Sequence, residues 1–184
     1  MANSPINVGI AGLGRSGYSI HKRAACADPQ HFRIAAVADE IPERLREVAS
    51  ELGCRAYDNF DALISDPDVE LVIVATYNYL HAEHTAKALK AGKHALCEKP
   101  FGLSVSDADS IIAAAKASKR KVFPFQQRRY EPDFRKVKEI VDSGILGEIV
   151  HIRICWQDFS RRWDWQTTRE RAGGALNNNG PHLL

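Results

Sequence analysis

Up to residue 125 the chain alternates short apolar runs with longer segments in which apolar residues recur at helical spacing. The residues of each short run are apolar in succession, which is typical of strands covered on both faces of a parallel sheet. We therefore predict an α/β fold with a doubly wound parallel sheet and right-handed crossovers. The predicted strands are residues 7–11, 33–38, 71–75, 94–97 and 121–123.

Four further segments have the apolar periodicity of amphipathic helices. Leu45, Val48 and Leu52 share one face of the first, and a glycine follows three of the four segments. Glycine is common directly after a helix C-terminus. Ser106 precedes the third segment. The predicted helices are residues 43–52, 81–91, 107–118 and 132–143.

The pattern changes after Phe125. Residues 149–156 alternate apolar and polar positions, which predicts a strand with one polar face in an open, mostly antiparallel sheet. One strand cannot make a sheet, and the chain ends at Leu184, within a segment that resembles the start of another element. We expect residues 126–184 to be a linker helix and the beginning of an incomplete C-terminal domain of a longer protein. The alternative is a natural short protein with a ragged end.

The composition is ordinary for a globular protein: 184 residues, 45% hydrophobic and 26% charged, with a net charge of +2. It excludes wholesale disorder and argues against a nucleic-acid or membrane-surface partner. No apolar stretch approaches the roughly 20 residues of a membrane span, and the N-terminus lacks the pattern of a secretory signal. Four cysteines without CxxC spacing predict reduced thiols and no metal site. We therefore expect a cytoplasmic protein.

A glycine-rich motif follows the first predicted strand. Gly12, Gly14 and Gly17 fit G-x-G-x-x-G, with Arg15 and Ser16 between the last two glycines. In this pattern the glycines allow a tight turn, close approach of a pyrophosphate and close helix packing, while the helix N-terminus attracts phosphate. Asp39 ends the second strand, where an acid accepts hydrogen bonds from the adenosine ribose and repels a 2′-phosphate. Residues 1–125 are therefore predicted to bind NAD rather than NADP; the alternative is a glycine turn and a surface aspartate.

Three further segments, together with the glycine loop, resemble the Gfo/Idh/MocA family of glucose–fructose oxidoreductase and inositol dehydrogenase-like enzymes. They are Thr-Tyr-Asn-Tyr-Leu-His at 76–81, the segment 92–100 ending in Glu98-Lys99-Pro100, and the glycine-rich segment 173–182. The resemblance implies an N-terminal Rossmann domain, a C-terminal α/β domain with an open sheet, and NAD(P)-dependent chemistry on sugars, polyols or related carbonyl compounds. For the full-length protein it implies a homodimer or homotetramer.

The chain departs from the family pattern at three positions. Tyr77 stands where the family often has proline, and Ala172 replaces the first of three glycines. Asn178 stands where many dehydrogenases of the family have an aspartate four residues before the histidine. An asparagine cannot accept a proton as a base, so an Asp–His pair is not available. Some branches of the family also have an Asn-Asn run before Gly-Pro-His.

Hydride transfer from a carbinol needs a base for the hydroxyl proton. His182 suits this role, because an unperturbed histidine pKa lies near working pH. Lys99 can hydrogen-bond the same oxygen and stabilise the developing alkoxide. Its place before Pro100 favours extended backbone, and similar enzymes often have a cis bond there. His182 and Lys99 are thus the predicted catalytic residues.

The resemblance also implies which residues contact the cofactor. It places Thr76, Asn78 and His81 at the ribose or nicotinamide, Glu98 at the ribose and Arg128 near the nicotinamide. The full predicted set is Gly12, Gly14, Arg15, Ser16, Gly17, Asp39, Thr76, Asn78, His81, Glu98, Lys99 and Arg128. Aromatic faces stack on sugar rings, so the substrate-side candidates are Arg162, Trp163, Trp165 and Asn178. For each residue an ordinary cap, loop or packing role is the alternative.

The leading hypothesis is an NAD-dependent dehydrogenase that acts on the CH–OH group of a sugar or polyol. Two alternatives stay open: a non-catalytic NAD-binding regulator, and an NAD-dependent glycosidase-like enzyme. Retention of Lys99 and His182 favours catalysis over regulation. No metal, nucleic-acid or membrane partner is expected.

Overall fold

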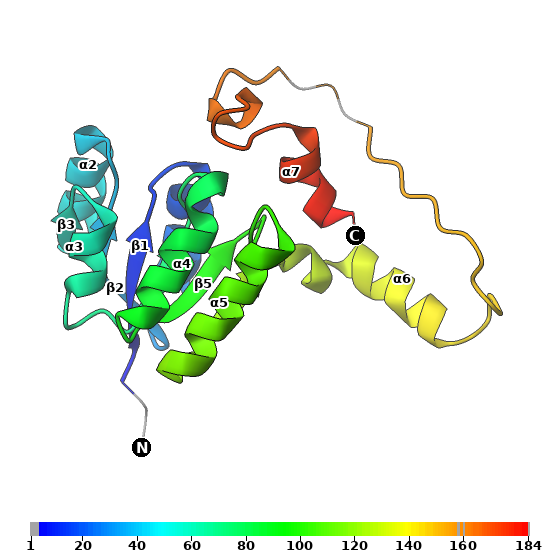
Figure 1. Cartoon of the computed structure of the whole chain (residues 1–184), viewed down its shortest axis with the longest axis horizontal. Coiled ribbons are helices and arrows are strands. Elements are labelled where there is room, and N and C mark those ends of the chain that lie inside the picture. Colours follow the sequence, from blue (N-terminus) through cyan, green and yellow to red (C-terminus); the bar gives the residue numbers. More distant parts are fainter. Residues whose placement is uncertain (1–3, 158, 160, 184) are drawn as a thin grey trace. The chain divides into compact units, whose positions relative to one another are not determined.

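The computed structural model describes residues 4–157, 159 and 161–183. The chain divides into two compact units, Met1–Phe125 and Gln126–Leu184 (Figure 1). None of the described helices is both long enough and apolar enough to span a membrane. All four cysteines lie in described segments, and each is a free thiol.

The first unit contains a single six-stranded sheet in the order β3-β2-β1-β4-β5-β6, and every neighbouring pair is parallel. The five predicted strands are confirmed. β3 was not predicted, because it is a three-residue edge strand without a continuous apolar run. The strands are β1 (Ile6–Ala11), β2 (Phe32–Ala38), β3 (Arg55–Tyr57), β4 (Leu71–Val74), β5 (His94–Glu98) and β6 (Val122–Phe125).

The helices of this unit connect successive strands, which confirms the doubly wound α/β prediction. In Figure 1, α4 and α5 lie side by side in front of the sheet. α5 begins earlier than predicted, because Ser104 rather than Ser106 caps it and Asp107 closes a capping box. The helices are η1 (Arg15–Lys22, a π-helix), α1 (Arg23–Ala27), α2 (Pro42–Leu52), α3 (Phe60–Ser65), η2 (Asn78–Leu80, a 3₁₀-helix), α4 (His81–Lys90) and α5 (Val105–Ser118).

Two hydrophobic clusters explain why the strands are apolar at consecutive positions. Val8 and Ile10 of β1 belong to one cluster, whereas Ala11 belongs to the other. In β4, Ile73 belongs to the first of these clusters, whereas Val72 and Val74 belong to the second. Successive side chains of a strand point to opposite faces, so both faces of this sheet are covered. The loops that contain most of the predicted site residues follow the carboxyl ends of β1, β2, β4 and β5.

The second unit contains helices but no sheet among its described residues. The predicted strand at 149–156 is not formed: these residues have no regular secondary structure, and Val150 and Ile152 are largely exposed. The physical reason is that strand pairing needs a hydrogen-bonded neighbour. The helices are η3 (Gln127–Tyr130), α6 (Pro132–Asp142), η4 (Trp165–Thr167), α7 (Ala175–Asn179) and η5 (Gly180–His182).

Candidate functional site

The three glycines of the loop after β1 meet different local constraints. A Cβ on Gly12 would lie 2.4 Å from the carbonyl oxygen of Ala75, and its φ of +87° is unfavourable for other residues. A Cβ on Gly17 would lie 1.8 Å from the carbonyl oxygen of Gly12. A Cβ on Gly14 would meet nothing within 4 Å. Gly12 and Gly17 therefore let the chain pack on itself, while Gly14 borders open space in which a ligand can approach the backbone.

Asp39 anchors this glycine loop. It follows β2 and is buried, and its Oδ2 accepts a hydrogen bond of 2.6 Å from the Leu13 N–H. Its Oδ1 accepts another of 2.9 Å from the Ile41 N–H. The Arg44 guanidinium, at the start of α2, lies 3.6 Å from Oδ2. The sequence spacing predicted an acid at the carboxyl end of β2. It did not predict the hydrogen bonds by which Asp39 holds the glycine loop, nor the nearby Arg44.

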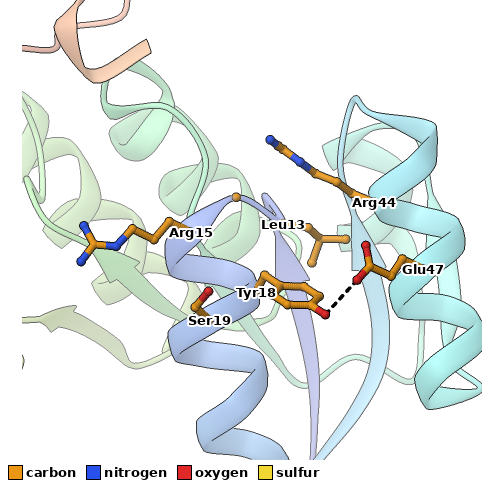
Figure 2. Close-up of a pocket in the computed structure, with 7 residues that line it drawn as sticks. Leu13, Arg15, Tyr18, Ser19, Arg44 and Glu47 are labelled. Atoms are coloured by element: carbon orange, nitrogen blue, oxygen red, sulfur yellow. Dashed lines mark hydrogen bonds between the residues drawn. The ribbon is translucent and has the colours of Figure 1, made fainter. Parts of the chain in front are cut away.

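A hollow of about 230 Å³ is lined by residues of the glycine loop, η1 and α2. Figure 2 shows Tyr18 pointing across it to Glu47, with a hydrogen bond of 2.9 Å between them. This bond raises the pKa of Tyr18 above its ordinary value. The lining includes two basic side chains, Arg15 and Arg44, together with the apolar Leu13 and the ring of Tyr18. Its residues are Leu13, Gly14, Arg15, Tyr18, Ser19, Arg44 and Glu47.

The loop after β4 is tied to the loop after β5 by His81. The ring of His81 is almost completely buried, with Nδ1 2.7 Å from the Pro100 carbonyl oxygen and Nε2 3.2 Å from that of Thr76. Burial lowers the pKa of His81, and a neutral imidazole can donate to only one of these two carbonyls at a time. This geometry gives His81 a role in holding two loops together, and a contact with ribose or nicotinamide stays a prediction.

The neighbouring side chains of this loop have partners of their own. Thr76 Oγ1 lies 3.2 Å from Nδ1 of His84, whose ring stacks on Phe60 at 3.9 Å between centroids. Burial lowers the pKa of His84 to about 4. Tyr77, in place of the family's proline, donates its hydroxyl hydrogen bond to Glu40. Asn78 is buried at the start of η2.

Glu98, at the end of β5, forms a buried pair with His21 of η1. His21 Nε2 lies 3.0 Å from Glu98 Oε1, and the Lys99 N–H donates to Oε2 at 3.1 Å. Burial by itself raises the pKa of Glu98, but the bonds to His21 and Lys99 outweigh it and hold that pKa below its ordinary value. Phe125 packs edge-on against His21 at 4.5 Å. The pair fixes the backbone that carries Lys99, where the Lys99–Pro100 bond is cis. Sequence reasoning missed His21.

In the second unit, His182 is held by Gln126 and Trp156. His182 Nδ1 lies 3.1 Å from Gln126 Oε1, and the Gln126 side-chain amide donates to the Pro181 carbonyl. The Trp156 ring lies 6.2 Å from the His182 ring, centroid to centroid. Arg128 stacks on Trp156, with its guanidinium carbon 4.5 Å from the centre of the indole ring. Two predicted residues, Arg128 and His182, thus share one cluster.

The predicted substrate-side residues have the following surroundings in the second unit. Arg162 pairs with Asp164 at 2.8 Å, and Asp164 caps η4, which contains Trp165. Trp163 is 90% exposed. Asn178 lies in α7, where its backbone N–H donates to Gly174. Their contact with substrate stays a prediction. Among the described residues, no three His, Cys, Asp or Glu side chains gather to hold a metal ion.

The chain belongs to the Gfo/Idh/MocA oxidoreductase family. Residues 6–126 match the model of the family's NAD-binding Rossmann fold, and residues 134–184 match a C-terminal domain of the same family. The chain spans about half the length of the curated relatives it matches.

Named relatives act on sugars and polyols. The chain is 34% identical over 154 residues to myo-inositol 2-dehydrogenase of Thermotoga maritima, which covers 83% of this chain and 46% of that protein. It is 33% identical over 174 residues to 2,7-anhydro-N-acetylneuraminate hydratase of Escherichia coli, covering 93% and 46%. Among solved structures, an NAD-binding protein from Listeria innocua superposes with a TM-score of 0.84 at 32% identity, covering 97% of this chain and 52% of that one.

Proposed function

We propose that the protein containing this chain is an NAD-dependent oxidoreductase that acts on the CH–OH group of a sugar or polyol. The observation that carries the proposal is the loop after β1, in which Gly14 borders open space and a buried acid holds the backbone in place. The similarity to a named myo-inositol 2-dehydrogenase supports the substrate class.

The residues of the first unit fit a dinucleotide. The start of η1 offers N–H groups and a positive dipole end to a pyrophosphate. No atom lies within 4 Å of the position that a Cβ on Gly14 would occupy, which leaves room for the pyrophosphate to approach the backbone. Each carboxylate oxygen has more than one lone pair, so Asp39 can accept from ribose hydroxyls while it holds Leu13 and Ile41. Its negative charge disfavours a 2′-phosphate, which is why we propose NAD over NADP. The other proposed contacts of this unit are Arg15, Ser16, Thr76, Asn78, His81, Glu98 and Lys99, and the second unit adds Arg128.

The proposed chemistry uses one residue from each unit. When bound, the nicotinamide supplies the hydride acceptor. His182 takes the hydroxyl proton of the substrate as the C–H bond breaks, and Lys99 donates a hydrogen bond to the same oxygen. The Glu98 carboxylate orients the Lys99 backbone through the 3.1 Å bond. We assign residues 1–125 to cofactor binding and residues 126–184 to the beginning of the substrate domain, which the C-terminal family match supports.

The test is turnover of the protein that contains this chain with NAD and a panel of sugars and polyols, followed by NADH fluorescence. Lys99→Ala should lower turnover by roughly a hundredfold or more, as loss of an oxyanion donor does, with NAD affinity nearly unchanged. Lys116→Ala, an exposed lysine of α5, is the matched control and should leave turnover within a few-fold. If Lys99→Ala behaves like this control, the catalytic assignment is wrong.

A second candidate is a reaction without net redox change. Its support is the similarity to a named hydratase of a sugar acid. In such a reaction the substrate carbon is oxidised and later reduced again, so that hydride is borrowed and returned while water is added or lost. Product formation without net NADH favours this candidate. Tight NAD binding with no turnover of any kind favours a non-catalytic regulator.

A further inference from the structure

The amide of Gln126 contacts two neighbours at once. This residue lies between β6 and η3, and its Nε2 donates to the carbonyl oxygen of Pro181. Its Oε1 lies 3.1 Å from Nδ1 of His182, in η5. Gln126 and His182 are 56 residues apart in sequence, so no local spacing indicated the pair.

The direction of both hydrogen bonds follows from the chemistry of the groups. A backbone carbonyl can only accept, so the NH₂ side of the Gln126 amide must face Pro181. The carbonyl side of that amide then faces His182, and it too can only accept. Nδ1 of His182 must therefore carry a proton and donate it to Gln126 Oε1. In a neutral imidazole with the proton on Nδ1, the lone pair that can accept another proton is on Nε2.

We propose that Gln126 is a positioning residue that holds His182 in the Nδ1–H tautomer, so that Nε2 is its basic nitrogen. In serine proteases a buried aspartate performs this orienting task for the catalytic histidine. Here a neutral amide performs it, and no carboxylate is required at position 178. The inference deepens the proposed function, because the catalytic use of Nε2 rests on His182 acting as the base.

Packing restricts the ring in addition to the hydrogen bond. The Trp156 ring lies 6.2 Å from the imidazole at an angle of 49°, and Arg128 stacks on that indole at 4.5 Å. Arg128 is itself held by Glu131 at 2.9 Å. A ring between an aromatic neighbour and a fixed acceptor has few alternative orientations. The tautomer is therefore set by Gln126, while Trp156 limits rotation of the ring that carries it.

The test is long-range ¹H–¹⁵N correlation spectroscopy of the imidazoles in the whole chain, because the two neutral tautomers give distinct nitrogen shifts. The chain has seven histidines, and the signals lost in His182→Gln assign the relevant ring. We expect the Nδ1–H tautomer for His182 in the wild type. In Gln126→Met the Nε2–H tautomer should become populated, whereas Gln126→Glu, which retains an acceptor, should keep the Nδ1–H form.

Gln127→Met is the matched control, since Gln127 is the next residue of the chain and begins η3, and the His182 signals should not change. A wild-type ring that is predominantly Nε2–H would overturn the proposal, as would a Gln126→Met spectrum identical to the wild type. If Gln126→Met unfolds, the Gln126→Glu spectrum decides: loss of the Nδ1–H form there would also overturn it.

Turnover separates this inference from the proposed function. If Nε2 is the base, Gln126→Met lowers turnover by up to the roughly 10²–10⁴-fold that general-base catalysis contributes, and Gln126→Glu recovers part of it. If the spectra are as expected but His182→Gln turns over normally, Gln126 still sets the tautomer and the catalytic assignment of His182 fails. If the spectra differ from expectation while His182→Gln is inactive, the function stands and this inference fails.

Discussion

At the scale of single residues, Asp39 combines two tasks that are usually considered separately. Its carboxylate holds the glycine loop through the Leu13 N–H, and we propose that it also accepts a hydrogen bond from the cofactor ribose. Because the same group serves both, its removal must affect the fold and the cofactor together. Removal of an aspartate that had only one of these tasks would change either stability or cofactor binding, but not both.

We predict that Asp39→Ala weakens NAD binding by roughly 1.5–3 kcal/mol, the range for a hydrogen bond to a charged group, and reduces discrimination against NADP. It should also lower the free energy of unfolding, because the N–H groups of Leu13 and Ile41 lose their acceptor. Calorimetric titration with both cofactors and urea unfolding measure the two effects. Glu43→Ala, an exposed acid of α2 paired with Arg46, is the control. Tighter binding of NADP than of NAD by the wild type would refute the assigned preference.

His84 supplies a pH-dependent contribution to stability. Its folded-state pKa is lowered to about 4 by burial, whereas an unfolded histidine titrates near about 6.5. Between these values the unfolded chain binds a proton that the folded chain does not. The free energy of unfolding should therefore not be reduced by His84 above about pH 6.5, and it should fall as pH is lowered toward about 4. Burial lowers the pKa of His81 in the same direction.

His84→Gln should accordingly flatten part of this pH dependence. Replacement of the ring also removes its stacking on Phe60, which lowers stability independently of pH, so the slope against pH is the quantity to compare. Urea unfolding at several pH values between about 7 and 4.5 measures it. An equal slope in wild type and variant would show that the pKa of His84 is not lowered in the folded protein.

At the scale of elements, the turn from β1 into η1 has one position open to a side chain and one closed to it. A Cβ at Gly14 meets nothing, and the backbone there has a φ of −70° and a ψ of −161°, which other residues adopt. A Cβ at Gly17 would collide with the Gly12 carbonyl. Gly17 is therefore needed for the fold, whereas the role that we propose for Gly14 is to let the cofactor approach the backbone.

We predict that Gly17→Ala lowers the free energy of unfolding by about 1–3 kcal/mol or more, because the backbone must shift to admit the methyl group. Gly14→Ala should leave stability unchanged or raise it by about 0.4–1 kcal/mol through the unfolded state, while weakening dinucleotide binding. Thermal unfolding compares the two variants directly. Equal destabilisation by both would contradict the assigned difference between the positions.

The local elements were predictable from sequence to the extent that one strand or one turn determines them. Residues of β1 and β4 are apolar in succession because both faces of the sheet are covered, and the glycine loop follows from its spacing. The pair His21–Glu98 joins residues 77 apart, and Gln126–His182 joins residues 56 apart. Such pairs depend on tertiary packing, so no period or motif indicated them. The strand predicted at 149–156 failed for the same reason, since alternation does not supply a partner strand.

At the scale of the whole molecule, the two units contribute different parts of one proposed reaction. The first carries the glycine loop, Asp39 and Lys99 at the carboxyl ends of its parallel strands. The second carries His182 with its orienting amide. The account therefore requires that the first unit bind a dinucleotide through the backbone at Gly14, whatever substrate the second unit helps to recognise.

Isothermal titration calorimetry of the chain with NAD tests this requirement most directly, with Gly14→Ala as the matched variant. The account predicts one NAD bound per chain by the wild type, and binding at least about tenfold weaker, or about 1.4 kcal/mol, in a Gly14→Ala variant that is equally stable to heat. Absence of binding by the folded wild type, or equal binding by the two proteins, would contradict it.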